Sequence, residues 1–317
     1  MKALMKTAPG KGNLELRDIP VPDIGEDDLL LRVSCCGVCG SDLHIEEGNH
    51  PCSPPVVLGH EFAGTVARVG SNVSGFTEGD AVAFRRGWSP YPGTGSNGGF
   101  AEYMRAPARC MWKTPAGITQ AEASQFETMV TPMRAVRDCA HVEAGDKVVV
   151  TGVGMIGLGA VAVAAIEGGE VWAVGTEADL AGRLPMAGAL GASRTLVFEQ
   201  SALEEIRRWE PRCWIEASGA AAAVEGASNA VAPGGTIVSP GLGTGPWNVN
   251  VGRMTYNNIT LQGMWGGNLA YLDDLVSWMQ TGRLDIKPLI QSMPLTQWRE
   301  AFHMVRSRQC IKVVLKP

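Results

Sequence analysis

The sequence predicts an α/β protein in which a doubly wound parallel sheet is combined with a second domain, an irregular β-barrel. Three features carry this prediction. A glycine-rich turn at 152–157 follows a buried strand and precedes an apolar helix. Strands and helices alternate beyond this turn, which is typical of a parallel sheet. The first hundred residues contain only short strands separated by turn residues, as in a small β-barrel.

Composition narrows the class of protein. A chain of 317 residues is long for one domain and predicts two. The net charge of −5 argues against a nucleic-acid or anionic-membrane surface. The chain has neither an apolar run of about 18 residues nor an apolar leader, so we expect no membrane span and no signal peptide. Its eight cysteines are scattered, which predicts reduced thiols in a cytoplasmic protein.

The first half of the chain is predicted to be mostly strands. A hairpin pairs 1–5 with 14–19 across the turn 9–13, and the residues 36–44 form a glycine-punctuated loop. Further short strands are expected at 28–34, 64–69, 81–84 and 98–104.

The pattern changes near Thr119, where Thr119-Gln120-Ala121-Glu122 has the form of a capping box and marks a domain boundary. The expected helices beyond this point cover 135–139, 180–190, 220–231 and 272–281. The expected strands cover 148–150, 170–174, 195–198, 214–219, 234–239, 259–264, 285–290 and 311–315.

The spacing Gly152-x-Gly154-x-x-Gly157 gives each glycine a physical reason. The first permits a sharp turn, the second lets the backbone approach a pyrophosphate, and the third lets helix and strand pack closely. The helix that follows offers free N–H groups to the phosphates. A purely structural glycine turn is the alternative interpretation.

A thiol, an imidazole and a carboxylate occur near one another in glycine-rich surroundings at Cys39, His60 and Glu61. These sulfur, nitrogen and oxygen donors together suit Zn²⁺. Three protein ligands and one open position would make a catalytic metal site. The alternative is a loop thiol at Cys39 and a hydrogen-bonded core histidine at His60.

Five motifs occur in the order found in medium-chain zinc-dependent alcohol dehydrogenases, and the chain resembles this family over nearly its whole length. The resemblance is closest to the sorbitol and threonine dehydrogenase branch, and it implies a Rossmann domain and a GroES-like catalytic domain. The motifs are Gly37-Val38-Cys39-Gly40-Ser41-Asp42-Leu43-His44, Gly59-His60-Glu61-Phe62-Ala63-Gly64, Gly79-Asp80-Ala81-Val82, Gly98-Gly99-Phe100-Ala101-Glu102-Tyr103 and Val150-Thr151-Gly152-Val153-Gly154-Met155-Ile156-Gly157.

The resemblance implies a role for each residue of the candidate metal site. Cys39 and His60 would be zinc ligands, and Glu61 would be a ligand or an exchangeable neighbour. Glu127 falls where that branch has a glutamate at the metal, and Cys139 is the weaker candidate. Ser41 would hydrogen-bond the substrate hydroxyl, and His44 would pass its proton toward solvent, unless His44 is simply an exposed loop histidine.

The chain departs from the family in one segment. Family members carry a lobe with four closely spaced cysteines that hold a structural zinc, whereas the corresponding residues 84–97 contain no cysteine. We therefore expect one catalytic Zn²⁺ and no structural zinc. The short loop either opens the site, or lets Arg85, Arg86 and Trp88 line it and meet an anionic substrate; a solvated turn is the simpler alternative.

The choice of dinucleotide depends on the end of the second strand of the parallel sheet. Gly175 stands near the position of the usual acidic residue, Glu177 lies close enough to hold a ribose hydroxyl, and the next cation is Arg183. This arrangement favours NAD over NADP. The full set of expected cofactor-binding residues is Gly152, Gly154, Met155, Ile156, Gly157, Gly175, Thr176, Glu177, Arg183, Ser218, Gly219, Pro240 and Gly241.

The sequence thus predicts a β-rich catalytic domain at 1–127 and 266–317 and a dinucleotide domain at 128–265. The expected activity is hydride transfer between NAD(P) and a secondary alcohol, such as a polyol, sugar or hydroxy-acid-like compound. A homodimer or homotetramer is implied by the resemblance, with the strand 259–264 as a candidate pairing edge. The alternatives are a zinc-independent NADPH-dependent quinone or enone reductase and a non-catalytic dinucleotide-binding protein.

Overall fold

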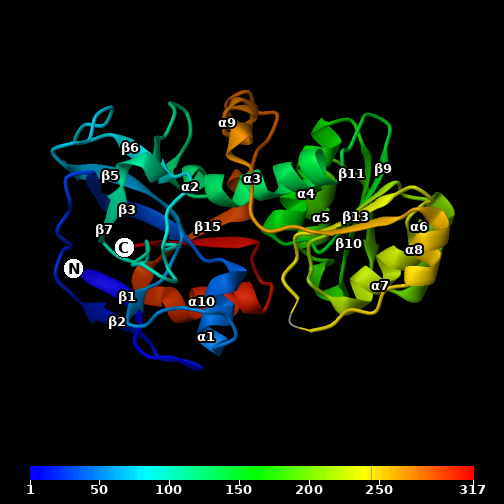
Figure 1. The fold of residues 1–317 in the computed structure, drawn as a ribbon, viewed down its shortest axis with the longest axis horizontal. Helices are drawn as coiled ribbons and strands as arrows, with labels where there is room; N and C mark the ends of the chain where they lie inside the picture. The colour runs from blue at the N-terminus through cyan, green and yellow to red at the C-terminus, as the bar shows by residue number, and fades with distance from the viewer. Residues whose placement is uncertain (244) are drawn as a thin grey trace. The chain divides into compact units, whose positions relative to one another are not determined.

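The computed structural model describes residues 1–243 and 245–317, which divide into two compact units. Unit 1 contains Met1–Glu127 and Asp285–Pro317, and unit 2 contains Thr128–Leu284. Residues 266–284, which we expected to group with residues 1–127, therefore cluster with unit 2. Each unit is drawn with its element labels in Figure 1.

Unit 1 is built mainly from antiparallel strands (Figure 1). One sheet has the order β2-β1-β4, and the other has the order β15-β16-β3-β5-β6-β8, with β7 also paired to β3. The strands are β1 (Lys2–Lys6), β2 (Leu14–Asp18), β3 (Asp28–Gly37), β4 (Val56–Val57), β5 (Glu61–Val69), β6 (Ala81–Phe84), β7 (Tyr103–Pro107), β8 (Met111–Lys113), β15 (Ile290–Pro294) and β16 (Lys312–Lys316).

Three α-helices lie within unit 1, and one of them replaces part of an expected loop. The residues 36–44 were predicted to form a loop, but α1 begins at Gly40 because Cys39 and Asp42 form a reciprocal capping box at its start. The expected strand 285–290 is also wrong, since β15 begins only at Ile290. The helices are α1 (Gly40–Glu47), α2 (Gln120–Ala123) and α10 (Trp298–Arg306).

Unit 2 contains a six-stranded sheet in which all strand pairs are parallel. Its strand order is β11-β10-β9-β12-β13-β14, with the first strand of the unit, β9, at the centre. The chain adds β10 and β11 on one side of β9 and then β12, β13 and β14 on the other side, so the strand order switches between β9 and β12. This order is that of the doubly wound fold, so the predicted class is confirmed. The strands are β9 (Lys147–Thr151), β10 (Glu170–Gly175), β11 (Ala192–Val197), β12 (Cys213–Glu216), β13 (Thr236–Ser239) and β14 (Thr260–Gly263).

Buried apolar strands explain why this sheet is covered by helices (Figure 1). The central strand β9 buries Val148, Val149 and Val150 completely, and Trp214 of β12 is equally buried. Strands of this kind need cover on both faces. The helices of unit 2 are α3 (Phe126–Arg134, which begins in unit 1), a π-helix (Ala135–Cys139), α4 (Met155–Ile166), α5 (Arg183–Ala189), α6 (Gln200–Trp209), α7 (Ala221–Ala230), α8 (Val251–Asn257) and α9 (Leu272–Gln280).

The segment 266–284 belongs to unit 2 because its side chains bond to the π-helix. Asn268 donates to Asp138 at 2.9 Å, and the Tyr271 hydroxyl donates to the other oxygen of the same carboxylate. The Arg137 guanidinium lies 4.8 Å from the centre of the Trp278 ring on α9. These contacts explain why the second crossing between units falls at 284 and not at 265.

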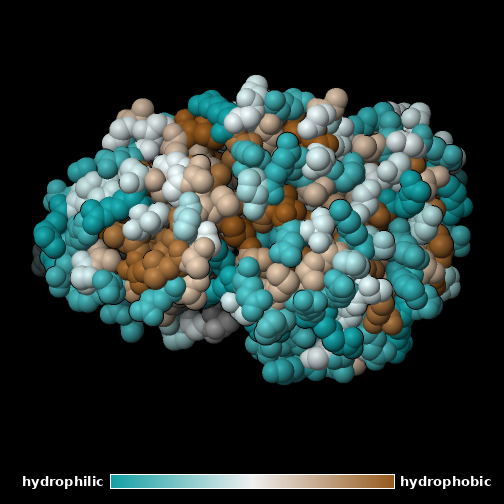
Figure 2. Space-filling view, turned by 180° about the vertical axis from the view of Figure 1, so that it is seen from behind, coloured by the Kyte–Doolittle hydropathy of each residue, from teal (hydrophilic) through white to brown (hydrophobic). Residues whose placement is uncertain are grey.

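The surface is mostly hydrophilic on the face drawn in Figure 2, where hydrophobic patches are interrupted by polar residues. Within the described residues, no helix is both long and apolar enough to cross a membrane.

Candidate functional site

Three side chains of unit 1 form a cluster with metal-binding donors. Cys39, His60 and Glu61 place one ligand atom each within 4.8 Å of one another. Ligand atoms of a tetrahedral Zn²⁺ site with bonds of about 2.0–2.3 Å lie roughly 3.3–3.8 Å apart. The donor chemistry fits Zn²⁺, and the ligand atoms would have to approach one another by up to about 1 Å to reach this spacing. We call these three residues the metal cluster.

Backbone pairing brings the metal cluster together. Strand β3 runs antiparallel to β5, with Gly37 opposite Glu61, and Cys39 caps the helix that follows β3. A Cβ atom at Gly37 would lie 2.1 Å from Glu61 Oε2, so only glycine leaves room for this carboxylate. The glycine in the Gly-Val-Cys-Gly motif thus has a steric reason next to the metal cluster.

Asp42 belongs to the site, although the sequence analysis gave it no role. Its Oδ2 accepts a hydrogen bond from the Cys39 backbone at 2.8 Å, and its Oδ1 lies 3.9 Å from His60 Nδ1. Both Asp42 Oδ1 and His60 Nδ1 are buried without a hydrogen-bond partner among the described residues. Carboxylates commonly orient metal-binding histidines by accepting the N–H of the ring, and Asp42 Oδ1 is the acceptor that faces His60 Nδ1 here. The only available signal was the carboxylate three residues after the cysteine.

The groups around His60 in the metal cluster stabilise a positive charge on or beside its ring. Burial by itself opposes protonation of His60, but the Cys39 hydrogen bond and the charges of Cys39, Asp42 and Glu127 outweigh it and raise the pKa of His60 to about 10. Burial raises the pKa of Asp42. Several acidic groups therefore share one buried region, and a bound cation would relieve their repulsion.

Lys312 on β16 is a second residue that the sequence analysis missed. Its ammonium donates to both carboxylate oxygens of Glu61, at 2.8 and 2.7 Å, and to the Val38 carbonyl at 3.1 Å. The side chains of Lys312 and Glu61 are only 5% and 1% exposed, so this is a fully buried ion pair. A lysine at the start of an apolar strand was the one signal in the sequence.

Glu127 is held by the short loop that follows β6. Arg86 Nε donates to Glu127 Oε1 at 2.5 Å, and the Tyr91 hydroxyl donates to the same oxygen at 2.9 Å. Arg86 is thus placed at the site, as one of the sequence interpretations supposed. Arg85 is exposed instead.

Ser41 and His44 lie on α1, three residues apart and so on one helix face. Ser41 Oγ is 3.5 Å from His60 Nε2, which brings this hydroxyl next to the metal cluster. His44 is partly buried in the last turn of the helix.

The glycine turn of unit 2 has the geometry that its spacing requires. Gly152 has a φ of +86°, and a Cβ atom on Gly157 would lie 1.7 Å from the Gly152 carbonyl oxygen. A Cβ atom on Gly154 would meet nothing within 4 Å, so this position borders open space. Gly154 caps α4, and Met155 and Ile156 form its first turn. A phosphate group fits such a turn.

Strand β10 ends in Gly175 and not in the acidic residue that usually ends the second strand of this fold. Gly175 is buried, and Thr176 and Glu177 are exposed. Asp179 accepts hydrogen bonds from the Thr176 backbone and hydroxyl at 2.8 Å, so a buried acid not considered in the sequence analysis fixes this turn. Arg183 lies 3.9 Å from the Asp179 carboxylate.

The turns after β12 and β13 meet the glycine turn. A Cβ atom on Gly152 would lie 2.6 Å from the Ser218 nitrogen, and one on Gly241 would lie 2.5 Å from the Gly219 nitrogen. The buried Glu216 accepts hydrogen bonds from the backbones of Ser218 and Gly219, at 2.8 and 3.0 Å. No local motif in the sequence marks this carboxylate. Pro240 precedes Gly241 in the same group of turns.

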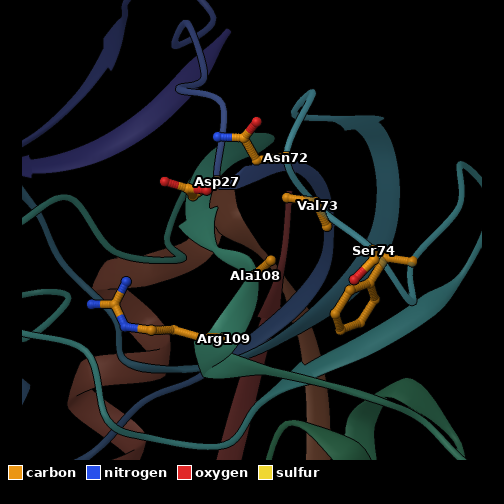
Figure 3. Close-up of a pocket in the computed structure, with 7 residues that line it drawn as sticks. Asp27, Asn72, Val73, Ser74, Ala108 and Arg109 are labelled. Atoms are coloured by element: carbon orange, nitrogen blue, oxygen red, sulfur yellow. The ribbon is translucent and has the colours of Figure 1, made fainter.

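Other candidate features lie apart from these residues. A hollow of about 430 Å³ is lined by residues that do not belong to the metal cluster, and Figure 3 shows six of them as labelled sticks. Cys139 accepts a hydrogen bond from Gln262 at 3.4 Å and is not part of the metal cluster. The residues lining the hollow are Asp27, Asn72, Val73, Ser74, Phe76, Ala108 and Arg109.

Two family models match the chain. The model described as the alcohol dehydrogenase GroES-like domain matches residues 25–116, and the model described as zinc-binding dehydrogenase matches residues 155–281. The first covers most of the β-rich part of unit 1, and the second covers most of unit 2.

Curated relatives match over their full lengths. A sorbitol dehydrogenase of Halalkalibacterium halodurans is 29% identical, and the match covers 100% of this chain and 99% of the relative. An L-threonine 3-dehydrogenase of Bacillus velezensis is 31% identical with the same coverage.

Solved structures match equally widely. A crystal structure of an NAD-dependent alcohol dehydrogenase has a TM-score of 0.91 at 26% identity and covers 100% of both chains. A zinc-binding dehydrogenase of Sinorhizobium meliloti 1021 bound to NADP has a TM-score of 0.89 at 25% identity, covering 100% of this chain and 99% of that one.

Proposed function

The chain belongs to the medium-chain zinc-dependent alcohol dehydrogenase family, and from this premise we propose that it reversibly oxidises a secondary alcohol with a nicotinamide dinucleotide. The substrate class is a polyol, a sugar or a hydroxy-acid-like compound, in keeping with the sorbitol and threonine dehydrogenases among its relatives. The observation that carries the proposal is the convergence of Cys39, His60 and Glu61 within 4.8 Å.

Cys39 and His60 would hold one Zn²⁺, with Glu61 and Glu127 as the acidic members of the site. When bound, Zn²⁺ supplies a Lewis acid that makes an alcohol hydroxyl easier to deprotonate. The absence of cysteine from residues 84–97 supports the proposal of a single zinc per chain, with no structural zinc.

The chain's own residues would position the substrate and move the proton. Ser41 would accept the hydroxyl proton through a hydrogen bond, and His44, on the same face of α1, would pass it toward solvent. Asp42 would keep the His60 ring in one orientation, and Lys312 would hold both carboxylate oxygens of Glu61.

The turn Gly152, Gly154, Gly157 would bind the pyrophosphate of the cofactor, with Met155 and Ile156 offering backbone N–H groups at the start of α4. The turns that contain Ser218, Gly219, Pro240 and Gly241 would border the nicotinamide, because they follow strand ends next to the switch point between β9 and β12.

We propose NAD as the preferred cofactor. Gly175 and Thr176 bring no charge to the end of β10, and the exposed Glu177 is free to face a ribose hydroxyl but would repel a 2′-phosphate. Arg183, the nearest following cation, lies beside the Asp179 carboxylate, which offsets its charge.

We also propose a homodimer or homotetramer in the cytoplasm. Strand β14 is an edge of the six-stranded sheet, and Trp265 directly beyond it is 67% exposed. An unpaired edge beside an exposed aromatic side chain suits pairing with a second copy. All eight cysteines lie in the described residues and none is in a disulfide bond, as expected in a reducing compartment.

The decisive experiment combines metal analysis with an activity panel. Purified protein should hold one Zn²⁺ per chain and reduce NAD faster than NADP over a panel of polyols, sugars and hydroxy acids. Cys39→Ala should lose both the metal and the turnover. Two tightly held zincs would contradict the single-zinc proposal, and full activity of Cys39→Ala would favour a zinc-independent reductase.

A further inference from the structure

The loop between β6 and β7 is fixed in place by aromatic side chains. The Trp88 ring centre lies 6.4 Å from those of Phe62 and Phe84, with both pairs edge to face. The Tyr91 ring lies 6.0 Å from that of Phe84 and 5.6 Å from that of His60. This loop is therefore not a solvated turn; it packs beside the metal cluster.

Arg86 adopts a backbone conformation that arginine rarely takes. Its φ is +91°, and the following Gly87 has a φ of +86°. Residues other than glycine are strained at such angles, and the strain persists only where surrounding contacts fix it. The contact here is the guanidinium group on Glu127, whose side chain is 7% exposed.

Every hydrogen bond that Glu127 receives falls on one oxygen. Arg86 Nε and Nη2 both lie 2.5 Å from Oε1, and the Tyr91 hydroxyl lies 2.9 Å from it. Among the described residues, Oε2 accepts no hydrogen bond. The Glu127 carboxylate is thus held through Oε1, while the lone pairs of Oε2 stay available to a ligand. It also lies close enough to His60 to act on the charge of that ring.

We propose that Arg86 and Tyr91 are positioning residues that hold Glu127 by Oε1 and leave Oε2 to bind the metal. This inference rests on the proposed metal site. The short loop would then hold Glu127 from behind by hydrogen bonds, whereas Asp42 faces His60 only as a charged neighbour at 3.9 Å. Outer partners of this kind affect metal affinity about 10- to 100-fold.

Arg86 also places a positive charge beside the Glu127 carboxylate. Without Arg86 the buried carboxylate would lose its charged partner and could turn toward solvent, which would weaken a metal ligand. With Arg86 in place, the hydrogen bonds from Arg86 and Tyr91 hold Glu127 in one orientation before the metal arrives. Metal binding then needs no reorganisation of this side chain.

The test measures Zn²⁺ affinity by competition with a chromophoric chelator, and the absorption of the Co²⁺-substituted protein. We expect Arg86→Ala to weaken Zn²⁺ binding about 10- to 100-fold and to change the Co²⁺ spectrum. Tyr91→Phe should cause a smaller loss, and Arg86→Lys should restore part of the affinity. The matched control is Arg85→Ala, which removes the neighbouring exposed arginine and should bind Zn²⁺ like the wild type.

A second comparison shows whether Arg86 acts through Glu127. In a Glu127→Ala background, the further change Arg86→Ala should have no additional effect on Zn²⁺ affinity. If Arg86→Ala weakens Zn²⁺ binding as much in the Glu127→Ala background as in the wild type, the proposal is overturned. Unchanged Zn²⁺ binding by the single variant Arg86→Ala also overturns it. Tighter Zn²⁺ binding does so too, because it means that Arg86 competes with the metal. If the wild-type protein binds no Zn²⁺, the proposed function itself is contradicted. If the wild type binds Zn²⁺ and Arg86→Ala binds it equally well, only the positioning role of Arg86 is contradicted.

Discussion

Gly154 and Gly157 stand three residues apart in one turn, yet a methyl group would have opposite consequences at the two positions. At Gly154 it would enter open space, and at Gly157 it would lie 1.7 Å from a carbonyl oxygen. We predict that Gly154→Ala keeps its stability within about 0.5 kcal/mol but binds NADH at least about tenfold more weakly, because the methyl group occupies the space that a phosphate needs. Gly157→Ala should instead lose roughly 1–3 kcal/mol of stability through overpacking.

Urea unfolding and NADH fluorescence titration separate these two effects. Gly188→Ala is the matched control, since this helical glycine also has nothing within 4 Å of a Cβ position but lies away from the turn. NADH affinity that is unchanged in Gly154→Ala would show that the turn does not hold the pyrophosphate.

Individual site residues were predictable to the extent that a local motif marks them. Cys39, His60 and Glu61 stand in short glycine-rich motifs, and the structure brings all three together. Lys312 could not be predicted, because it reaches Glu61 across the pairing of β16 with β3, far away in sequence. Arg86 likewise depends on where the loop folds.

Among the elements, the link between α9 and the π-helix contains a hydrogen bond whose donor can titrate. Burial and the hydrogen bond to Asp138 raise the pKa of Tyr271 to about 12, from an ordinary value of 10.0. The folded state therefore holds this proton more tightly than the unfolded state does. Its contribution to stability is complete below pH 10 and is lost as the pH rises toward 12.

We predict that the unfolding free energy of the wild type falls between these two pH values, and that Tyr271→Phe reduces the fall. Tyrosinate absorbance should show one group fewer titrating near pH 12 in the variant. Tyr256→Phe is the control, since Tyr256 is 90% exposed and should not alter the high-pH stability. Equal pH dependence in wild type and Tyr271→Phe would contradict the assignment.

At this scale the sequence predicted elements well where turn residues bound a short apolar run, as in the expected strand 81–84, which is β6. It failed where a cap or a tertiary contact decides. Helix α1 has little hydrophobic pattern and begins because Cys39 and Asp42 cap it, so its glycine-rich start suggested a loop. The strand at 285–290 was misplaced because apolar residues there pack as a short 3₁₀ turn before β15.

At the scale of the whole molecule, the open edge of the parallel sheet is a candidate site for pairing between subunits. Strand β14 pairs only with β13, and Thr260 N–H and Met264 N–H both point toward β13 or the turn beyond it. Because donors alternate along a strand, the N–H groups of Leu261 and Gly263 point to the open side. An edge with free donors can pair with a second copy of the same strand.

In the oligomer proposed above, Gly263→Pro should therefore separate the subunits without unfolding them. Proline removes the outward N–H of residue 263 but none of the bonds to β13, and an extended residue before it is tolerated. We predict that sedimentation shows this variant at half the wild-type mass or less, with the circular dichroism spectrum retained. Gly263→Ala keeps the N–H group and should sediment like the wild type. A variant Gly263→Pro that keeps the wild-type mass would place the subunit contact elsewhere than β14, since Gly263 supplies one of the two outward donors of this edge.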